Sequence, residues 1–163
     1  MRDIVLDGES LKIRDVVETG LGKTIVSLSN KAREKMENSR LGINRILQSG
    51  ETTYGVNTGF GALSSVSIDS DKLEALQVNL IRSHACGVGE EMENKHTLMM
   101  MLIRANTLCR GNSGARPLIV DTLISMINHK ICPAIPRIGS LGASGDLAPL
   151  SHLAMGMMGE GFC

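Results

Sequence analysis

Apolar residues recur along most of the chain with the period of an amphipathic helix. Leu73, Leu76 and Leu80 stand at positions i, i+3 and i+7, on one helix face. Residues 98–109 are apolar nearly all round, which predicts a helix buried on several sides. We therefore expect a mainly α-helical fold. Helices are expected from a cap at Ser10 to near Gly20, from a cap at Ser29 to Gly50, from a cap at Asp69 or Ser70, from a cap at Asn94 to about Arg110, from about Pro117 to near His129, and from Asp146 or Leu147 to about Gly159.

Two short extended segments and three long loops complete the pattern. Residues 3–6 and 24–27 read as short extended pieces. The loops are rich in glycine and small residues and cover 51–68, 85–90 and 133–145. Glycine permits backbone angles that other residues avoid, so Gly-rich loops between strong helices are candidates for function.

The interior must be filled with few aromatic side chains. The chain has no Trp, one Tyr, two Phe and ten Met. Flexible methionine side chains suit the packing of helix on helix. In the second helix, the residues expected to face inward are Ala32, Met36, Ile43, Ile46 and Leu47.

Bulk composition narrows the class of protein. A length of 163 residues allows one domain, with no internal boundary within 1–163. Lys and Arg number 17, as do Asp and Glu, and this balance argues against a nucleic-acid binder and gives no reason for a membrane-surface role. The N-terminal residues hold no apolar stretch typical of a signal peptide, and the longest apolar run, 98–103, is too short to span a bilayer. A cytoplasmic location is therefore expected.

The four cysteines give no disulfide framework. They are Cys86, Cys109, Cys132 and Cys163, none in a CxxC pair, and we expect reduced and mostly buried thiols. His129 stands three residues before Cys132, a spacing that suits a metal. No second pair completes such a site, so no metal is expected.

Residues 139–146 hold the parts of an unusual electrophile. The Gly145 amide nitrogen can attack the Ala143 carbonyl carbon in a tightly bent loop, and glycine makes that approach sterically possible. Loss of one water closes an imidazolone ring, and loss of the Ser144 hydroxyl as a second water leaves an exocyclic alkene. A nucleophile elbow, Gly-x-Ser-x-Gly, is not present, because Asp146 stands where its last glycine belongs. The structural alternative is a Gly-rich loop with Asp146 as the cap of the next helix.

Two long motifs resemble those of a known family. The segment GSLGASGDLAPLSHLA (139–154) resembles the signature of the aromatic amino-acid ammonia-lyases, which build a methylidene-imidazolone (MIO) cofactor from their own Ala-Ser-Gly. Tyr54 to Gly61, YGVNTGFG, is similar to the family's loop with a catalytic tyrosine. The resemblance runs along nearly the whole chain, including RANTLCRGNSGARP, and covers about the first third of a family member.

The resemblance implies roles for particular residues. Ala143, Ser144 and Gly145 would form MIO, and Tyr54 would be the acid/base residue near the substrate β-carbon. Removing a weakly acidic β-proton needs a strong base, and a phenolate qualifies if its pKa is lowered from about 10. The alternative for Tyr54 is a core tyrosine with a satisfied hydroxyl, which the flanking glycines and polar loop disfavour.

His84 bears on the substrate. The pair Ser83-His84 resembles the histidine-specific branch of the family, and a histidine can recognise an imidazole by hydrogen bonding. The alternative is a histidine that caps a helix C-terminus. His96 and His152 are expected to be ordinary surface or packing residues.

The resemblance therefore implies the helical N-terminal portion of an ammonia-lyase (aspartase-like) fold that eliminates ammonia from L-histidine to give urocanate. A phenylalanine or tyrosine lyase, or an aminomutase, is the alternative within the family. A non-catalytic helical fragment or self-association module is the alternative of another class. Family members are homotetramers whose active sites combine subunits. The chain ends at Cys163 soon after an apolar helical pattern, so we expect a truncated piece that is inactive and carries no MIO by itself.

Overall fold

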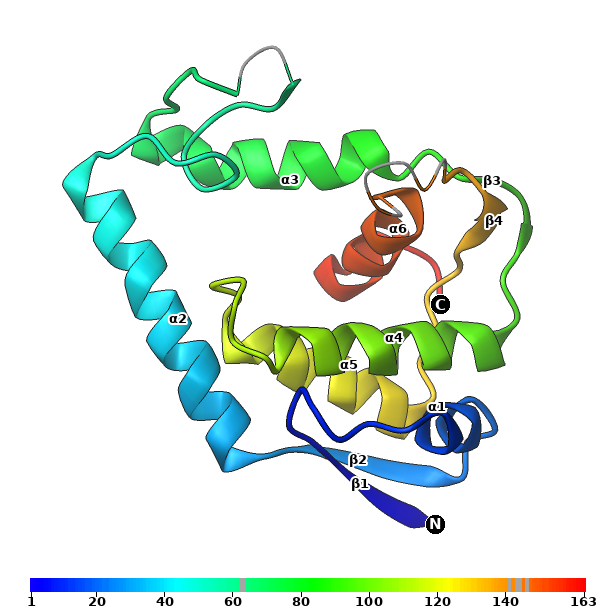
Figure 1. Cartoon of the computed structure of the whole chain (residues 1–163). Helices are drawn as coiled ribbons and strands as arrows, with labels where there is room; N and C mark the ends of the chain where they lie inside the picture. Colours follow the sequence, from blue (N-terminus) through cyan, green and yellow to red (C-terminus); the bar gives the residue numbers. More distant parts are fainter. Residues whose placement is uncertain (62–63, 141, 143–144, 146) are drawn as a thin grey trace.

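The chain folds into six α-helices, one 3-10 helix and four short strands among the residues described, and the expected mainly α class is confirmed (Figure 1). The computed structural model describes residues 1–61, 64–140, 142, 145 and 147–163. The elements in chain order are β1 (Arg2–Leu6), α1 (Ile13–Gly20), β2 (Thr24–Leu28), α2 (Asn30–Ser49), the 3-10 helix η2 (Ser70–Lys72), α3 (Leu73–His84), β3 (Val88–Glu91), α4 (Asn94–Leu108), α5 (Pro117–His129), β4 (Pro136–Ile138) and α6 (Leu147–Met158).

The N-terminal strands form a parallel pair joined by α1. Arg2 is opposite Thr24 and Leu6 is opposite Leu28, which confirms the two extended segments expected from the sequence. Alternate residues of the strands, including Ile4, Leu6 and Val26, are buried against the helices. This alternation is the period of a strand with one face on the core.

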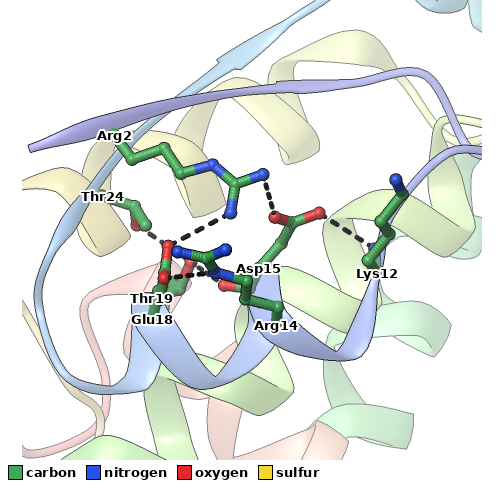
Figure 2. A network of polar contacts seen from close by, with 7 residues as sticks. All are labelled: Arg2, Lys12, Arg14, Asp15, Glu18, Thr19 and Thr24. Atoms are coloured by element: carbon green, nitrogen blue, oxygen red, sulfur yellow. Dashed lines mark hydrogen bonds and ion pairs between the residues drawn. The ribbon is translucent and has the colours of Figure 1, made fainter.

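A network of charges fixes α1 beneath the strand pair (Figure 2). The Arg2 guanidinium forms ion pairs with Asp15 at 2.9 Å and with Glu18 at 3.2 Å. Arg14 donates a further hydrogen bond to Glu18 at 2.7 Å. These hydrogen bonds, first that from Arg14 and then that from Arg2, hold the pKa of Glu18 below its ordinary value. Asp15 is buried, and its pairing with Arg2 offsets the cost of removing that charge from water.

One side-chain amide closes an edge of β2. Asn128 on α5 accepts a hydrogen bond from the Val26 backbone N–H and donates one to the Val26 carbonyl, both at 2.9 Å. The amide thus supplies the donor and acceptor that a neighbouring strand would otherwise provide. This pair of bonds anchors α5 to the sheet.

The core lies between α4, α5 and the inner face of the strands. Met101, Leu102 and Ala105 of α4 are fully buried, as is Val120 of α5. The expectation for residues 98–109 is confirmed in part, because Ile103 is half exposed on the face of α4 that turns away from this core. On α5, the expected span from Pro117 to His129 is observed, with proline in the first turn where its missing N–H costs nothing.

Helix caps test the local predictions most closely. Ser29 caps α2 by accepting a hydrogen bond from the Ala32 N–H, and Gly50 ends that helix in the left-handed region at φ +71°, both as expected. The cap at Ser10 was wrong: α1 starts after Lys12, whose N–H donates to the Asp15 carboxylate at 3.0 Å. The Ser10 N–H instead donates to Asp7 in the preceding turn. The cap of α4 is Glu93, one residue before the expected Asn94.

The second half of α2 is less covered than its sequence suggests. Ala32 and Met36 are buried as expected, but Ile43 and Ile46 are only partly buried, and Leu47 is exposed. Figure 1 shows the reason, since α2 leads away from the strands toward the loop that precedes α3. Arg33 pairs with Asp121 at 2.7 Å and ties only the first turns of α2 to α5.

A second pair of strands was not foreseen. β3 and β4 are antiparallel. β4 lies inside segment 133–145, and all of β3 except Glu91 lies inside segment 85–90, both of which the sequence predicted as loops. The pairing runs from Val88 opposite Ile138 to Glu91 opposite Pro136, with an irregularity between. Strands this short have no visible period, and their pairing depends on a partner far along the chain.

Candidate functional site

Tyr54 lies on the loop between α2 and η2. The residue is 65% exposed, and its ring meets the Phe60 ring edge-on, with centroids 5.9 Å apart. Tyr54, Gly61 and Ser64 line a shallow hollow. Tyr54 is therefore not part of the core of the described chain.

The loop around Tyr54 is held by two buried polar residues. The Asn57 side chain accepts from the Thr53 N–H at 2.8 Å and donates to the Glu51 carbonyl at 2.9 Å. Asn57 and Thr58 are 5% and 1% exposed. These internal bonds give the loop a defined shape that does not depend on regular secondary structure. Sequence reasoning did not single out Asn57, although an Asn between glycine-rich turns is a common sign of such a scaffold.

His84 is the last residue of α3. Its Nδ1 lies 2.8 Å from the Leu80 carbonyl oxygen and 3.0 Å from the Ser83 hydroxyl. A carbonyl can only accept, so Nδ1 carries the proton, and in the neutral ring Nε2 is then the acceptor. Nδ1 thus bonds to a carbonyl near the helix C-terminus, as the helix-capping alternative expects. Nε2 can still accept a hydrogen bond from a ligand.

The motif at 139–146 is described only in part. Gly145 is exposed and Gly142 and Gly145 have φ angles of +65° and +127°, a region that favours glycine. The Gly145 carbonyl accepts from the Leu147 N–H at 3.1 Å, directly before α6. Of the residues expected to form the electrophile, Ala143 and Ser144 lie outside the described residues, as does Asp146, the alternative cap.

His84 and Gly139, the first residue of segment 139–146, lie at the same end of α3. Gly87 lies three residues after His84 and packs against Gly139. A Cβ added to Gly139 would stand 2.8 Å from the Gly87 Cα. His152, one turn inside α6, accepts a hydrogen bond from the Gly87 N–H at 3.1 Å. Sequence reasoning missed this contact, since nothing local to His152 indicates a partner 65 residues earlier.

The segment between α2 and η2 includes Tyr54. Figure 1 shows this segment beside the first part of α3, whereas β3 and β4 lie at the C-terminal end of that helix. The helix has 12 residues, which corresponds to about 18 Å. Among the described residues, the ring contact of Tyr54 is with Phe60.

The residues present fit a cofactor made from the chain itself. The motif supplies the serine, the attacking glycine nitrogen and, on both sides of the unplaced residues, backbone angles that favour glycine. A Cβ added to Gly145 would meet no atom within 4 Å, so the described surroundings leave room there. Across the described ranges, no three His, Cys, Asp or Glu side chains gather as metal ligands. Among the helices described, none combines the length and apolar character needed to cross a membrane.

Comparison with known proteins agrees with this arrangement. The sequence pattern of the family described as "Aromatic amino acid lyase" matches residues 11–163. A histidine ammonia-lyase from Staphylococcus saprophyticus is 50% identical over 157 residues, which cover 96% of this chain and 31% of that protein. The chain thus spans about a third of the length of the relatives it matches.

Solved structures give the same grouping. Histidine ammonia-lyase from Trypanosoma cruzi superposes with a TM-score of 0.89 at 40% identity, covering 99% of this chain and 30% of that one. A tyrosine aminomutase from Streptomyces globisporus superposes with a TM-score of 0.88 at 38% identity, covering 93% and 28%. The helical arrangement, the two motifs and the match over residues 11–163 lead to one conclusion: the chain belongs to the aromatic amino acid lyase family.

Proposed function

We propose that the protein carrying this chain is a carbon-nitrogen lyase that eliminates ammonia from L-histidine to give urocanate. The observation that carries the proposal is His84 at the C-terminal end of α3, three residues before the contact of Gly87 with Gly139, where segment 139–146 begins. The 50% identity to a histidine ammonia-lyase over 96% of this chain supports the choice of substrate. Because the chain spans 31% of that relative, the activity proposed is that of the whole protein.

In this proposal, Ala143, Ser144 and Gly145 cyclise to MIO. The ring supplies an electrophilic alkene that no unmodified side chain offers, and which labilises the substrate for loss of ammonia. The remaining work falls to ordinary side chains. Tyr54 removes the β-proton of the substrate, and the exposure of this residue supports that role.

His84 binds the imidazole of the substrate. Its Nδ1 proton is engaged by the Leu80 carbonyl, so Nε2 of the neutral ring is an acceptor. An imidazole N–H of histidine can donate to it, whereas phenylalanine has no such donor. The hydrogen bond to Leu80 also fixes the orientation of the ring, which lowers the entropy lost on binding.

We propose further that the site is completed by a second copy of the chain in a homo-oligomer, a homotetramer on the family resemblance. The support is the exposure of Tyr54 in the single chain, where its ring contacts Phe60 and the residue is 65% exposed. A base must reach the proton that it takes, and an exposed Tyr54 is open to a substrate held by another copy. The partners proposed are thus an amino-acid substrate and further copies of this chain. The four free thiols support a reducing compartment, the cytoplasm.

Mass spectrometry tests the cofactor directly. The peptide containing residues 139–146, taken from the whole protein, should be two waters lighter than its sequence. Ser144→Ala cannot form the alkene, and histidine turnover should fall by about three orders of magnitude or more. Normal turnover in that variant, or an unmodified peptide in an active protein, contradicts the proposal.

Mixing two inactive variants tests the shared site. Tyr54→Phe and Ser144→Ala should each be inactive alone. After joint refolding or co-expression, mixed oligomers should contain some sites that combine Tyr54 from a Ser144→Ala copy with the intact Ala-Ser-Gly motif from a Tyr54→Phe copy. Urocanate formation should then reappear, and its absence in verified mixed oligomers would mean that each chain supplies both residues.

The likeness to a tyrosine aminomutase supports a second candidate within the family. A phenylalanine or tyrosine lyase, or an aminomutase, would release cinnamate, coumarate or a β-amino acid. Product analysis with histidine, phenylalanine and tyrosine separates these activities. The 163-residue chain by itself is expected to be inactive and uncyclised, because holding the tripeptide bent costs backbone strain of about 1–3 kcal/mol that surrounding structure must maintain. Two lost waters in that isolated chain would contradict this expectation, and a purely structural helical module would show no turnover in any form.

A further inference from the structure

We infer that His152 is a positioning residue that sets where His84 lies relative to α6, the helix that follows the Ala-Ser-Gly motif in the sequence. The inference rests on the proposed function, since it concerns how the substrate-binding histidine is held. His152 is assigned neither a catalytic nor a substrate-binding role above. It lies on α6, whereas His84 is the last residue of α3.

The contact has a defined direction. The Gly87 backbone N–H donates to His152 Nε2 at 3.1 Å. Nε2 must then be unprotonated, so the neutral ring carries its hydrogen on Nδ1. His152 is partly buried, which shields the hydrogen bond from competing water.

Packing leaves the Gly87 backbone little freedom beside this bond. A Cβ on Gly87 would stand 3.1 Å from His152 Nε2 and 3.1 Å from the Pro136 Cβ. A Cβ on Gly139 would stand 2.8 Å from the Gly87 Cα and 3.3 Å from the Ala148 Cβ. Two backbone segments therefore cross at Gly87 and Gly139, and α6 covers the crossing. We call this group, Gly87, Pro136, Gly139, Ala148 and His152, the glycine crossing.

The glycine crossing links both parts of the proposed site. His84 lies three residues before Gly87, and Gly145 lies two residues before the start of α6. The hydrogen bond from the Gly87 N–H to the His152 side chain joins the segment that follows His84 to helix α6. Losing it lets segment 85–87 move relative to α6, and with it the His84 ring. A displacement of about 1 Å in a binding group is enough to weaken its contact with a substrate.

Amide hydrogen exchange at Gly87 tests the contact without reference to activity. In the whole protein, His152→Leu removes the acceptor and should speed exchange of the Gly87 amide by about tenfold, the effect of one lost hydrogen bond. His152→Gln offers an oxygen acceptor on a side chain of similar reach and should restore most of the protection. His129→Leu, a matched change at an exposed histidine on α5, should leave Gly87 unchanged. Equal exchange in His152→Leu and wild type overturns the inference.

Steady-state kinetics test the positioning role. If His152 acts through His84, His152→Leu should raise KM for histidine by about tenfold while kcat changes by less than about threefold, because His84 holds the imidazole in ground and transition states alike. The 139–146 peptide should still lose two waters. His152→Gln should return KM close to wild type. A fall in kcat with unchanged KM, or equal defects in Leu and Gln, means that His152 only stabilises the fold and overturns the inference.

The two proposals fail in different ways. A wild-type protein that keeps both waters and consumes no histidine refutes the proposed lyase, whatever the exchange data show. A wild-type lyase whose His152→Leu variant exchanges Gly87 normally refutes the positioning role alone.

Discussion

Arg82 and Glu160 form a two-point ion pair that joins α3 to the segment after α6. The two guanidinium nitrogens lie 2.8 and 2.6 Å from the two carboxylate oxygens. This geometry makes the pair more directional than a single surface contact. It adds a second tie between α3 and the C-terminal region besides the glycine crossing.

The ion pair gives a pH-dependent stability with a definite sign. The hydrogen bonds from Arg82 hold the pKa of Glu160 below its ordinary value of 4.5. A lowered carboxyl pKa stabilises the fold above the ordinary value, and that contribution is lost as the pH falls through the lowered value. Thermal unfolding should therefore show Glu160→Gln less stable than wild type near neutral pH, with the gap closing in acid. Glu34→Gln, the same charge change at an exposed residue of α2, is the control. A gap that is constant with pH contradicts the assignment.

Tyr54 is expected to act through its hydroxyl. Tyr54→Phe keeps the ring against Phe60 but removes the proton-transfer group, so kcat for histidine should fall by about a hundredfold or more. The melting temperature should stay close to wild type, because the hydroxyl is at the surface. Phe60→Leu disturbs the same ring contact and keeps the hydroxyl, and it should lose much less activity. Similar losses in both variants would mean that ring packing, not proton transfer, is what matters.

His84 is expected to discriminate between substrates. His84→Leu removes the Nε2 acceptor, so kcat/KM should fall more for histidine than for phenylalanine or tyrosine, by about tenfold or more in the ratio. His96→Leu, at an exposed histidine in the first turn of α4, should leave the ratio unchanged. An equal loss for both kinds of substrate would give His84 a structural role only.

Asn128 is expected to matter for stability alone. Asn128→Leu leaves the Val26 N–H and carbonyl without their partners, and each unpaired buried group costs about 1–3 kcal/mol. The free energy of unfolding should fall by about 2–4 kcal/mol, measured by denaturant titration. His129→Gln, the next residue on the exposed side of α5, should change it by less than about 0.5 kcal/mol. A loss no larger than that of the control would show that water replaces the amide.

The thiols are expected to react in two classes. Cys86 and Cys163 are exposed, whereas Cys109 and Cys132 are buried. Burial raises the pKa of Cys109 to about 11 and also raises that of Cys132. Since the thiolate is the reactive form, alkylation of the native chain near pH 8 should label the exposed pair first. All four should react in denaturant, and early labelling of Cys109 in native conditions would contradict the packing around α4.

Helix spans were predictable because their signals are local. The period of the leucines in α3, the Ser29 cap and the Gly50 end of α2 each depend on residues within a turn or two. The Ser10 cap was wrong because Asp7 competes for the Ser10 N–H and Asp15 supplies an alternative cap. β3 and β4 escaped notice because neither has enough residues to show a period.

The candidate site was predictable in chemistry but not in geometry. Ala-Ser-Gly can be recognised from atoms that are adjacent in the chain. The exposure of Tyr54 depends on the shape of its loop, which the Asn57 side chain holds by hydrogen bonds to Thr53 and Glu51 that no local pattern indicates. His152 depends on a hydrogen bond across 65 residues, and no pattern around it indicates that contact.

The Asn128 contact with Val26 also bears on the order in which the chain folds. The two residues are 102 positions apart, so β1, α1 and β2 leave the ribosome long before α5 is made. Until α5 docks, the Val26 N–H and carbonyl that Asn128 later binds can bond only to water. The strand pair also lacks the packing that α5 provides. A two-stranded sheet is marginally stable by itself, so the N-terminal unit should gain full protection only when residues 117–129 arrive. Closing so long a loop favours slow, cooperative folding of the N-terminal strands with α5.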